Sequence, residues 1–190
     1  MLIGLVGRKG SGKDTVGAYL VKEHEFERKA FADLLKKSVS ELFDIPYHEI
    51  EKYKNDDAAM VTLSIKDGLI RKLSFREFLQ FYGTESHRDV FGGDFWVDHV
   101  LPFEGFYAGR NIVFTDCRFR EEADRIRALN GFIVKINKRR ALSEQDPHRS
   151  EVQADMGHIE YRIENNGTIE ELFEEIENML MHLAMKRSEL

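Results

Sequence analysis

A short apolar segment followed by a glycine-rich turn constrains this chain more than any other feature of its sequence. Residues 2–6 (LIGLV) are apolar without alternation, which is typical of a strand buried on both faces of a parallel sheet. Residues 7–15 (GRKGSGKDT) then combine three glycines with basic side chains. From Lys13 to about His24 the apolar positions fit a helix. The segment therefore predicts a strand, a tight turn and a helix in direct succession.

This turn has the spacing of a loop that binds phosphates. Its glycines allow backbone N–H groups to point at an anion, Lys13 can reach the outer phosphates, and the following helix adds its positive end. The usual motif has Ser or Thr after the lysine, whereas here Asp14 follows and Thr15 comes next, as a possible direct or water-mediated ligand of Mg²⁺. A glycine-rich turn without a ligand is the alternative. The candidate phosphate-binding residues are Gly7, Arg8, Lys9, Gly10, Ser11, Gly12, Lys13, Asp14 and Thr15.

Composition and charge narrow the class of protein further. The 190 residues, 42% of them hydrophobic, suit one domain with a small inserted lobe. A net charge of −6 disfavours binding to nucleic acid polymers or membrane surfaces, and no apolar run approaches the ~20 residues of a membrane span. The N-terminus does not resemble a secretory signal, and the single cysteine, Cys117, excludes an intrachain disulfide. We therefore expect a cytoplasmic monomer or homodimer.

The remaining apolar patterns predict an α/β fold. Strand and helix patterns alternate along the chain, which indicates a parallel sheet covered by helices. We expect a three-layer fold with a mostly parallel five-stranded sheet, and a helical lobe inserted at about residues 31–101. Further strands are predicted at 111–116, 132–136 and 161–164, a β-hairpin at 61–73, and helices at 31–43, 46–53, 74–82, 94–101, 118–129 and after 168.

The motifs of GTP-binding switches are not met. Residues 89–92 match D-x-x-G by letter, but they follow a helix pattern and not a buried strand. Residues 137–140 (NKRR) lack the aspartate that ends N-K-x-D. Both matches are interpreted as accidental.

Several blocks of the sequence, spread over nearly its full length, resemble the bacteriophage deoxynucleoside monophosphate kinases. This family of P-loop nucleotide kinases phosphorylates deoxynucleoside monophosphates with ATP and Mg²⁺. The resemblance implies one P-loop kinase domain over 1–190, an acceptor-binding insertion, and the host cytoplasm as the location of a phage-encoded enzyme. Dephospho-coenzyme A kinase and phosphomevalonate kinase have a similar loop and stay open as alternatives, as does a module that binds ATP without turnover. The blocks are GSGKDT, FADLLK at 31–36, FLQFYGTESHRDVFGGDFWVD at 78–98, TDCRFREEADRIRALNG at 115–131, PHRSE at 147–151 and NNGT at 165–168.

Two residues after the second predicted strand are candidates for catalysis. Asp116 ends that strand, and a carboxylate at the carboxyl end of a parallel strand faces the ligand crevice, where it can hold a water of the Mg²⁺ shell. Capping of the next helix is the alternative. Arg118 would lie over the same crevice and contact a substrate phosphate, unless it is solvated. The predicted catalytic residues are Lys13, Arg88, Asp116 and Arg118.

A second group of candidates lies in the predicted insertion. Glu85, Arg88 and Asp89 are spaced to share one helix face, and the resemblance suggests that Arg88 grips the acceptor monophosphate. An ion pair between Glu85 and Arg88 is the alternative. Trp96 could stack on a base or fill the core. The expected acceptor-binding residues are Asp33, Lys36, Glu85, Arg88, Asp94 and Trp96.

Two further segments complete the predicted site. The polar stretch 137–158 carries four basic residues that could close over the phosphates as a lid, or form a solvated loop: Lys138, Arg139, Arg140 and Arg149. In related kinases the turn after the last strand borders the adenine of ATP, which assigns Asn165, Asn166 and Gly167 to that side. Capping of the last helix explains the same turn equally well.

Overall fold

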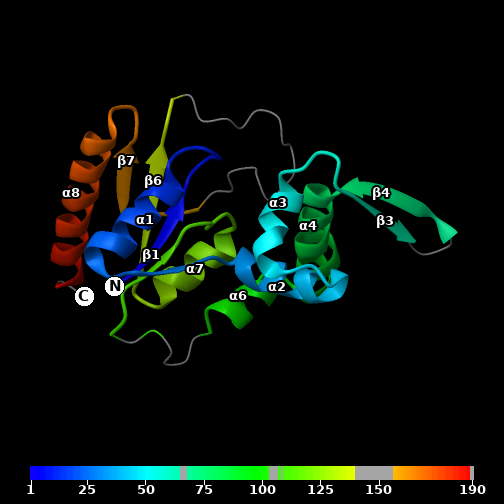
Figure 1. The fold of residues 1–190 in the computed structure, drawn as a ribbon. Coiled ribbons are helices and arrows are strands. Elements are labelled where there is room, and N and C mark those ends of the chain that lie inside the picture. Colours follow the sequence, from blue (N-terminus) through cyan, green and yellow to red (C-terminus); the bar gives the residue numbers. More distant parts are fainter. Residues whose placement is uncertain (65–67, 103–106, 108, 140–155, 189–190) are drawn as a thin grey trace. The chain divides into compact units, whose positions relative to one another are not determined.

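The computed structural model describes residues 1–64, 68–102, 107, 109–139 and 156–188. These residues form two compact units, one made of Met1–Phe31 and Leu101–Leu190 and the other of Ala32–Val100 (Figure 1). Among the helices described, none has both the length and the apolar character needed to cross a bilayer.

The first unit is built on a five-stranded sheet. All its neighbouring strands pair in parallel, in the order β2-β5-β1-β6-β7. The expected α/β class and the number of strands are confirmed, and the sheet is parallel throughout. Its strands are β1 (Leu2–Val6), β2 (Glu27–Lys29), β5 (Ile112–Phe114), β6 (Phe132–Asn137) and β7 (Tyr161–Glu164).

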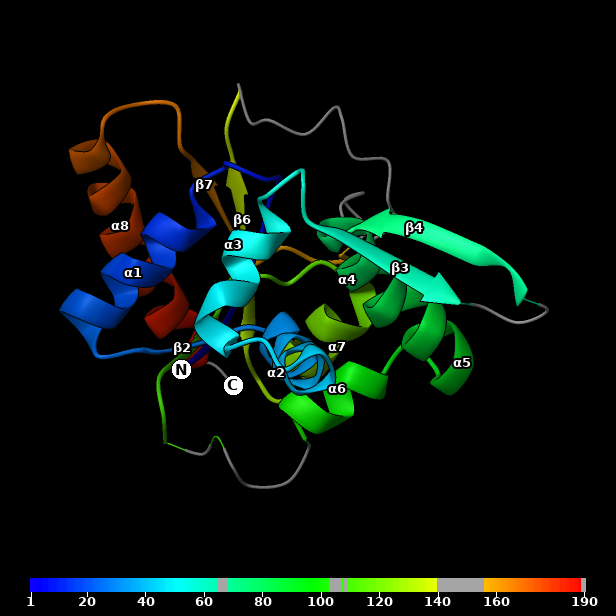
Figure 2. The same cartoon turned by 45° about the vertical axis from the view of Figure 1, so that its right-hand side comes forward.

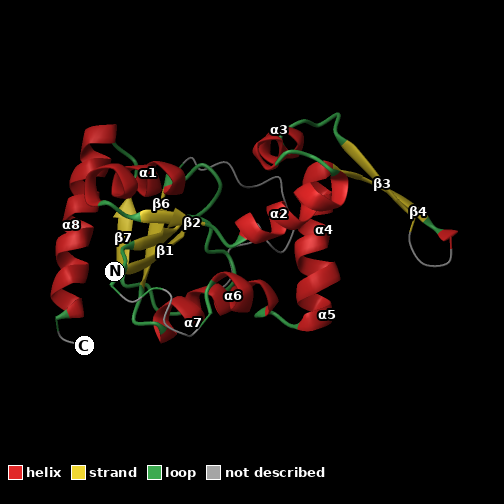
Figure 3. Ribbon diagram, turned by 60° about the horizontal axis from the view of Figure 1, so that its bottom comes forward, coloured by secondary structure: helices red, strands yellow, loops and turns green. Residues whose placement is uncertain are grey.

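Helices cover both faces of this sheet (Figure 3). Alternation along β1 directs Ile3 and Leu5 into the core shared with α1 (Lys13–His24) and α8 (Ile169–Arg187). Gly4 faces the opposite layer, where a Cβ would lie 2.6 Å from Ile126 Cδ1 on α7 (Arg120–Ala128). The glycine therefore lets α7 pack closely on the strand. Because all five strands are parallel, their carboxyl ends meet at one edge of the sheet.

The second unit is helical and carries the predicted hairpin, which Figure 2 shows as a two-stranded ribbon next to α4. The hairpin pairs Met60 with Ser74 in antiparallel register, and Ser74 forms a capping box with Glu77. Its elements are α2 (Ala32–Phe43), η1 (Tyr47–Glu49), α3 (Ile50–Lys54), β3 (Met60–Ser64), β4 (Ile70–Ser74), α4 (Phe75–Gly83), η3 (Thr84–Arg88), α5 (Asp89–Phe91) and α6 (Phe95–Val100).

One local expectation in this unit is wrong. The predicted shared face of Glu85, Arg88 and Asp89 assumed a regular α-helix, but Thr84–Arg88 form a turn of π-helix. A π-turn has a longer period than an α-turn, so it rotates the following side chains around the axis. Arg88 is consequently buried, whereas Glu85 and Asp89 are exposed.

Candidate active site

The glycine-rich loop connects the buried strand β1 to α1, as the sequence predicts. Gly7 and Gly12 have φ values of 155° and 108°, which favour glycine over other residues. The space at both positions is also restricted. A Cβ at residue 7 would lie 2.5 Å from the carbonyl oxygen of Ile136, and one at residue 12 would lie 2.4 Å from Nδ2 of Asn165. The loop conformation therefore depends on the absence of side chains at these positions.

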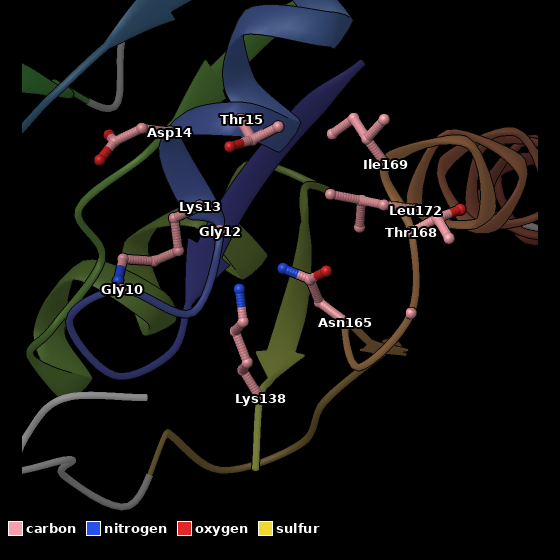
Figure 4. Close-up of a pocket in the computed structure, with 11 residues that line it drawn as sticks. Gly10, Gly12, Lys13, Asp14, Thr15, Lys138, Asn165, Thr168, Ile169 and Leu172 are labelled. Carbon is pink, nitrogen blue, oxygen red and sulfur yellow. The ribbon is translucent and has the colours of Figure 1, made fainter. Parts of the chain in front are cut away.

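A pocket of about 390 Å³ opens at this loop, within the first unit (Figure 4). One wall is the loop and the first turn of α1, where backbone N–H groups have no intrahelical acceptor. The opposite wall comes from the end of β6, the turn after β7 and the start of α8. The lining residues are Gly10, Gly12, Lys13, Asp14 and Thr15 on the first wall, and Lys138, Asn165, Gly167, Thr168, Ile169 and Leu172 on the second.

Two lysines bring positive charge to the pocket. Lys13 donates hydrogen bonds to the carbonyl oxygens of Gly7 and Arg8, over 2.7 and 3.0 Å. Lys138 is exposed, and Figure 4 shows its ammonium group directed toward Gly12 and Asn165. With the amino-terminal end of α1, these groups favour an anion in the pocket.

Asp116 follows β5 at the carboxyl edge of the sheet. Its Oδ1 accepts a hydrogen bond of 2.8 Å from the backbone N–H of Phe31. The alternative role as a cap of the next helix does not hold, because the cap position of α7 is Phe119. Arg118 is half-buried, and its backbone N–H donates to Glu122 Oε2 over 2.7 Å. Neither Asp116 nor Arg118 is among the described residues that line the pocket.

The turn after β7 contributes to the pocket and also caps α8. Thr168 and Glu171 form a capping box, and a Cβ at Gly167 would collide with the Glu171 carboxylate that closes it. Asn165 is 9% exposed and donates from Nδ2 to the carbonyl oxygen of Ser11 over 2.7 Å. Asn166 accepts from the backbone N–H of Arg139 through Oδ1 over 2.9 Å. The helix-capping alternative is therefore part of the structure, alongside the contact with the loop.

The predicted acceptor residues are all in the second unit, and two of them are buried and donate to backbone carbonyl groups. Arg88 is 6% exposed and donates from Nη1 to the carbonyl oxygen of Gly93 over 2.6 Å. Trp96 is 5% exposed and donates from Nε1 to the carbonyl oxygen of Gly83 over 2.8 Å. Its ring is thus part of the core of this unit, the alternative that the sequence left open. Glu85 and Asp94 are exposed.

Asp33 and Lys36 lie on α2. Asp33 accepts a hydrogen bond of 3.0 Å from the Tyr47 hydroxyl, and Lys36 forms an ion pair with Glu51. Burial disfavours the charged form of Glu51, but the ammonium groups of Lys36 and Lys54 outweigh it and hold the pKa of that carboxyl below its ordinary value. Both α2 side chains therefore have partners within their own unit.

The structure describes two of the four predicted lid residues. Of the four lid residues, Lys138 and Arg139 are exposed at the end of β6, and Arg140 and Arg149 lie outside the described residues. Ile169, which the sequence did not mark as a site residue, is 44% exposed and lines the pocket. The signal that could have located it is its place directly after the Thr168 cap, in the first turn of the helix.

The oxygen donors present suit Mg²⁺ bound together with a nucleotide. In the part of the chain that the structure describes, no group of three or more His, Cys, Asp or Glu side chains is placed to hold a metal. Mg²⁺ at phosphate sites keeps several waters and takes only one or two protein ligands. The hydroxyl of Thr15 in the pocket and the carboxylate of Asp116 fit such a sparse set.

Comparison with known proteins agrees with this geometry. The family model described as "Deoxynucleotide monophosphate kinase" matches residues 45–176, more than half of the chain. The chain belongs to the deoxynucleotide monophosphate kinase family. A protein of Acanthamoeba polyphaga mimivirus, named "Putative deoxynucleotide monophosphate kinase", is 33% identical over 199 aligned positions, which cover 93% of this chain and 94% of the relative.

Membership in the deoxynucleotide monophosphate kinase family confirms the predicted family and supports a nucleotide monophosphate kinase activity. The match to the family model begins after the phosphate loop, at residue 45. The loop, with its pocket and its lysines, is therefore an observation separate from that match.

Proposed function

We propose that this member of the family transfers the γ-phosphoryl group of MgATP to a deoxynucleoside monophosphate. The observation that carries the proposal is the pocket at the amino-terminal end of α1, where Lys13 and Lys138 accompany backbone N–H groups. This arrangement suits a polyphosphate because it offers positive charge and hydrogen-bond donors together.

The donor nucleotide occupies this pocket in our proposal. Residues 7–15 hold its phosphates, Lys13 stabilises the charge that develops on the transferred group, and Asn165, Asn166 and Gly167 lie toward its adenine. Ile169 and Leu172 add apolar surface beside that turn. When bound, Mg²⁺ would neutralise charge on the β- and γ-phosphates, and Thr15 and Asp116 would hold it directly or through water.

We assign the acceptor monophosphate to Arg88, because a guanidinium can grip a phosphate through two parallel hydrogen bonds. Arg118, two residues after Asp116 in the first unit, is assigned separately as a cation for a substrate phosphate. Arg88 has a fixed direction since its Nη1 is bonded to the Gly93 carbonyl. Asp33, Lys36, Glu85 and Asp94 accompany Arg88 in the unit Ala32–Val100, to which we assign acceptor binding.

The decisive experiment measures ADP release in a coupled assay against a panel of acceptors. The panel holds the four deoxynucleoside monophosphates, the four ribonucleoside monophosphates and dephospho-coenzyme A. Turnover is expected with at least one deoxynucleoside monophosphate. Turnover with dephospho-coenzyme A alone, or ATP binding without turnover of any acceptor, would contradict the proposal.

Arg88 provides a second test. Arg88→Ala is expected to raise the KM for the acceptor more than the KM for ATP, because it removes a cation from the acceptor phosphate. The opposite order of effects would reverse the assignment of the two substrates.

A further inference from the structure

Asn165 occupies an unusual position between the sheet and the phosphate loop. It directly follows β7, and its backbone N–H donates to the carbonyl oxygen of Asn137 over 2.8 Å, which extends the pairing of β7 with β6. Its side chain leaves the sheet and donates from Nδ2 to the carbonyl oxygen of Ser11 over 2.7 Å. One residue therefore connects the carboxyl edge of the sheet with a loop about 150 positions earlier in the sequence.

The bonded carbonyl belongs to the peptide between Ser11 and Gly12. A trans peptide is planar, and its C=O and N–H groups point in opposite directions. Fixing the Ser11 carbonyl toward Asn165 therefore fixes the Gly12 N–H on the other side of the same plane. Gly12 lines the pocket and is the cap position of α1, where N–H groups lack intrahelical acceptors.

The fit between Asn165 and Gly12 leaves little room for another arrangement. A Cβ on Gly12 would lie 2.4 Å from Asn165 Nδ2, so the amide rests against the glycine backbone. Gly12 has a φ of 108°, a conformation that its neighbours must stabilise. At 9% exposure, the Asn165 side chain is also too confined to change its partner easily.

We propose that Asn165 is a positioning residue for the donor phosphates: its amide orients the Ser11–Gly12 peptide so that the Gly12 N–H points at the bound anion. This proposal rests on the proposed function, because it takes the pocket to hold a polyphosphate. It differs from the adenine-side role of the same turn, since here the asparagine acts through the loop and its effect does not depend on a base.

The test compares binding of MgATP with binding of tripolyphosphate, which has no base, by calorimetry. Asn165→Ala removes the donor and is expected to weaken both ligands by the same factor, about tenfold. Asn165→Asp keeps the shape but replaces the donor with a carboxylate that repels the Ser11 carbonyl, and we expect a larger loss for both ligands. In the kinase assay, the KM for ATP should rise more than kcat falls.

Asn137→Ala is the matched control. The Asn137 side chain donates to Glu164 Oε1 over 2.6 Å at the same edge of the sheet, and that bond does not involve the loop. The affinity of Asn137→Ala for MgATP and for tripolyphosphate is expected to equal that of the wild type. The thermal midpoints of Asn165→Ala and Asn137→Ala show how much each substitution destabilises the fold.

Three outcomes would overturn the inference. If Asn165→Ala weakens MgATP but not tripolyphosphate, the side chain acts on the base. If it lowers the thermal midpoint but leaves both affinities unchanged, the hydrogen bond is only structural. If the wild type binds neither ligand, the proposed function fails first, and the inference fails with it.

Discussion

The ammonium group of Lys13 donates a hydrogen bond of 2.7 Å to the carbonyl oxygen of Gly7, the first residue after β1. A second bond of 3.0 Å, to the Arg8 carbonyl, holds the same group against the loop. The backbone of the phosphate loop therefore holds the Lys13 ammonium group in position. Binding of a polyphosphate would exchange these neutral acceptors for charged ones, which form stronger hydrogen bonds with an ammonium group.

Lys13→Ala should accordingly abolish most of the activity, by at least about 100-fold in kcat, because it removes the charge that faces the transferred group. The fold should survive, since Lys13 is at the start of α1 and lines the pocket. Lys22→Ala is the control on the same helix, because Lys22 is exposed and pairs with Glu23. Near-normal turnover of Lys13→Ala, with circular dichroism as the check of folding, would end the phosphate-loop assignment.

Two substitutions at Asp116 separate its charge from its hydrogen bond. In Asp116→Asn the amide oxygen can still accept a hydrogen bond from the Phe31 N–H, so the stability should stay within about 0.5 kcal/mol of the wild type. The loss of the charge should lower kcat about 10- to 100-fold and raise the Mg²⁺ concentration needed for half-maximal activity. Asp116→Ala loses both the charge and the hydrogen-bond acceptor, so it should also lower the free energy of unfolding by about 1–2 kcal/mol. Denaturant unfolding and Mg²⁺ titrations of the activity measure the two effects. Equal destabilisation by both variants would make the carboxylate a structural group only.

Trp96→Phe tests whether the tryptophan is a core residue. The variant keeps an aromatic ring but leaves the Gly83 carbonyl without the 2.8 Å hydrogen bond from Nε1, so we expect a loss of about 1–3 kcal/mol in stability. The KM for the acceptor should change little, because the ring is 5% exposed. A large rise in this KM with unchanged stability would instead support stacking of Trp96 on the base.

The contact between α1 and α8 predicts a specific pH dependence. The Tyr19 hydroxyl donates to Glu177 Oε1 over 2.8 Å, and His24 Nε2 lies 2.7 Å from the same oxygen. These hydrogen bonds, that of Tyr19 first, hold the pKa of Glu177 below its ordinary value of 4.5. A lowered folded-state pKa means that the contribution to stability is present above about pH 4.5 and is lost as the pH falls through the lower value.

Glu177→Gln should therefore lower the thermal midpoint by at most about 2 °C at neutral pH, and its difference from the wild type should shrink in acid. The bond from Tyr19 to Glu177 also raises the pKa of the Tyr19 phenol, so the contribution of the phenol should be present below pH 10 and be lost above the raised value. Glu174→Gln removes an equal charge from the exposed side of α8 and is the control. A difference that stays constant down to pH 2 would contradict this linkage.

Features encoded by neighbouring residues could be predicted from the sequence. The loop of residues 7–15, the capping boxes at Ser74 and Thr168, and the hairpin all depend on side chains a few positions apart. The missed strand β2 shows the limit of such patterns. Its residues Glu27–Lys29 are charged, and as an edge strand it is joined to β5 by backbone bonds that leave no apolar signature.

The sequence by itself determined the α/β class, the family and the phosphate loop, because each follows from local spacing and from blocks of matching residues. The tertiary structure alone decided which side chains become partners. Three contacts or orientations depend on this packing. They are the hydrogen bond from Asn165 to the Ser11 carbonyl, the burial of Arg88 at the end of the π-turn and the exposure of Ile169 at the pocket. Those contacts form only when segments distant in the chain are brought together, and the short-range periodicity of the sequence carries no information about them.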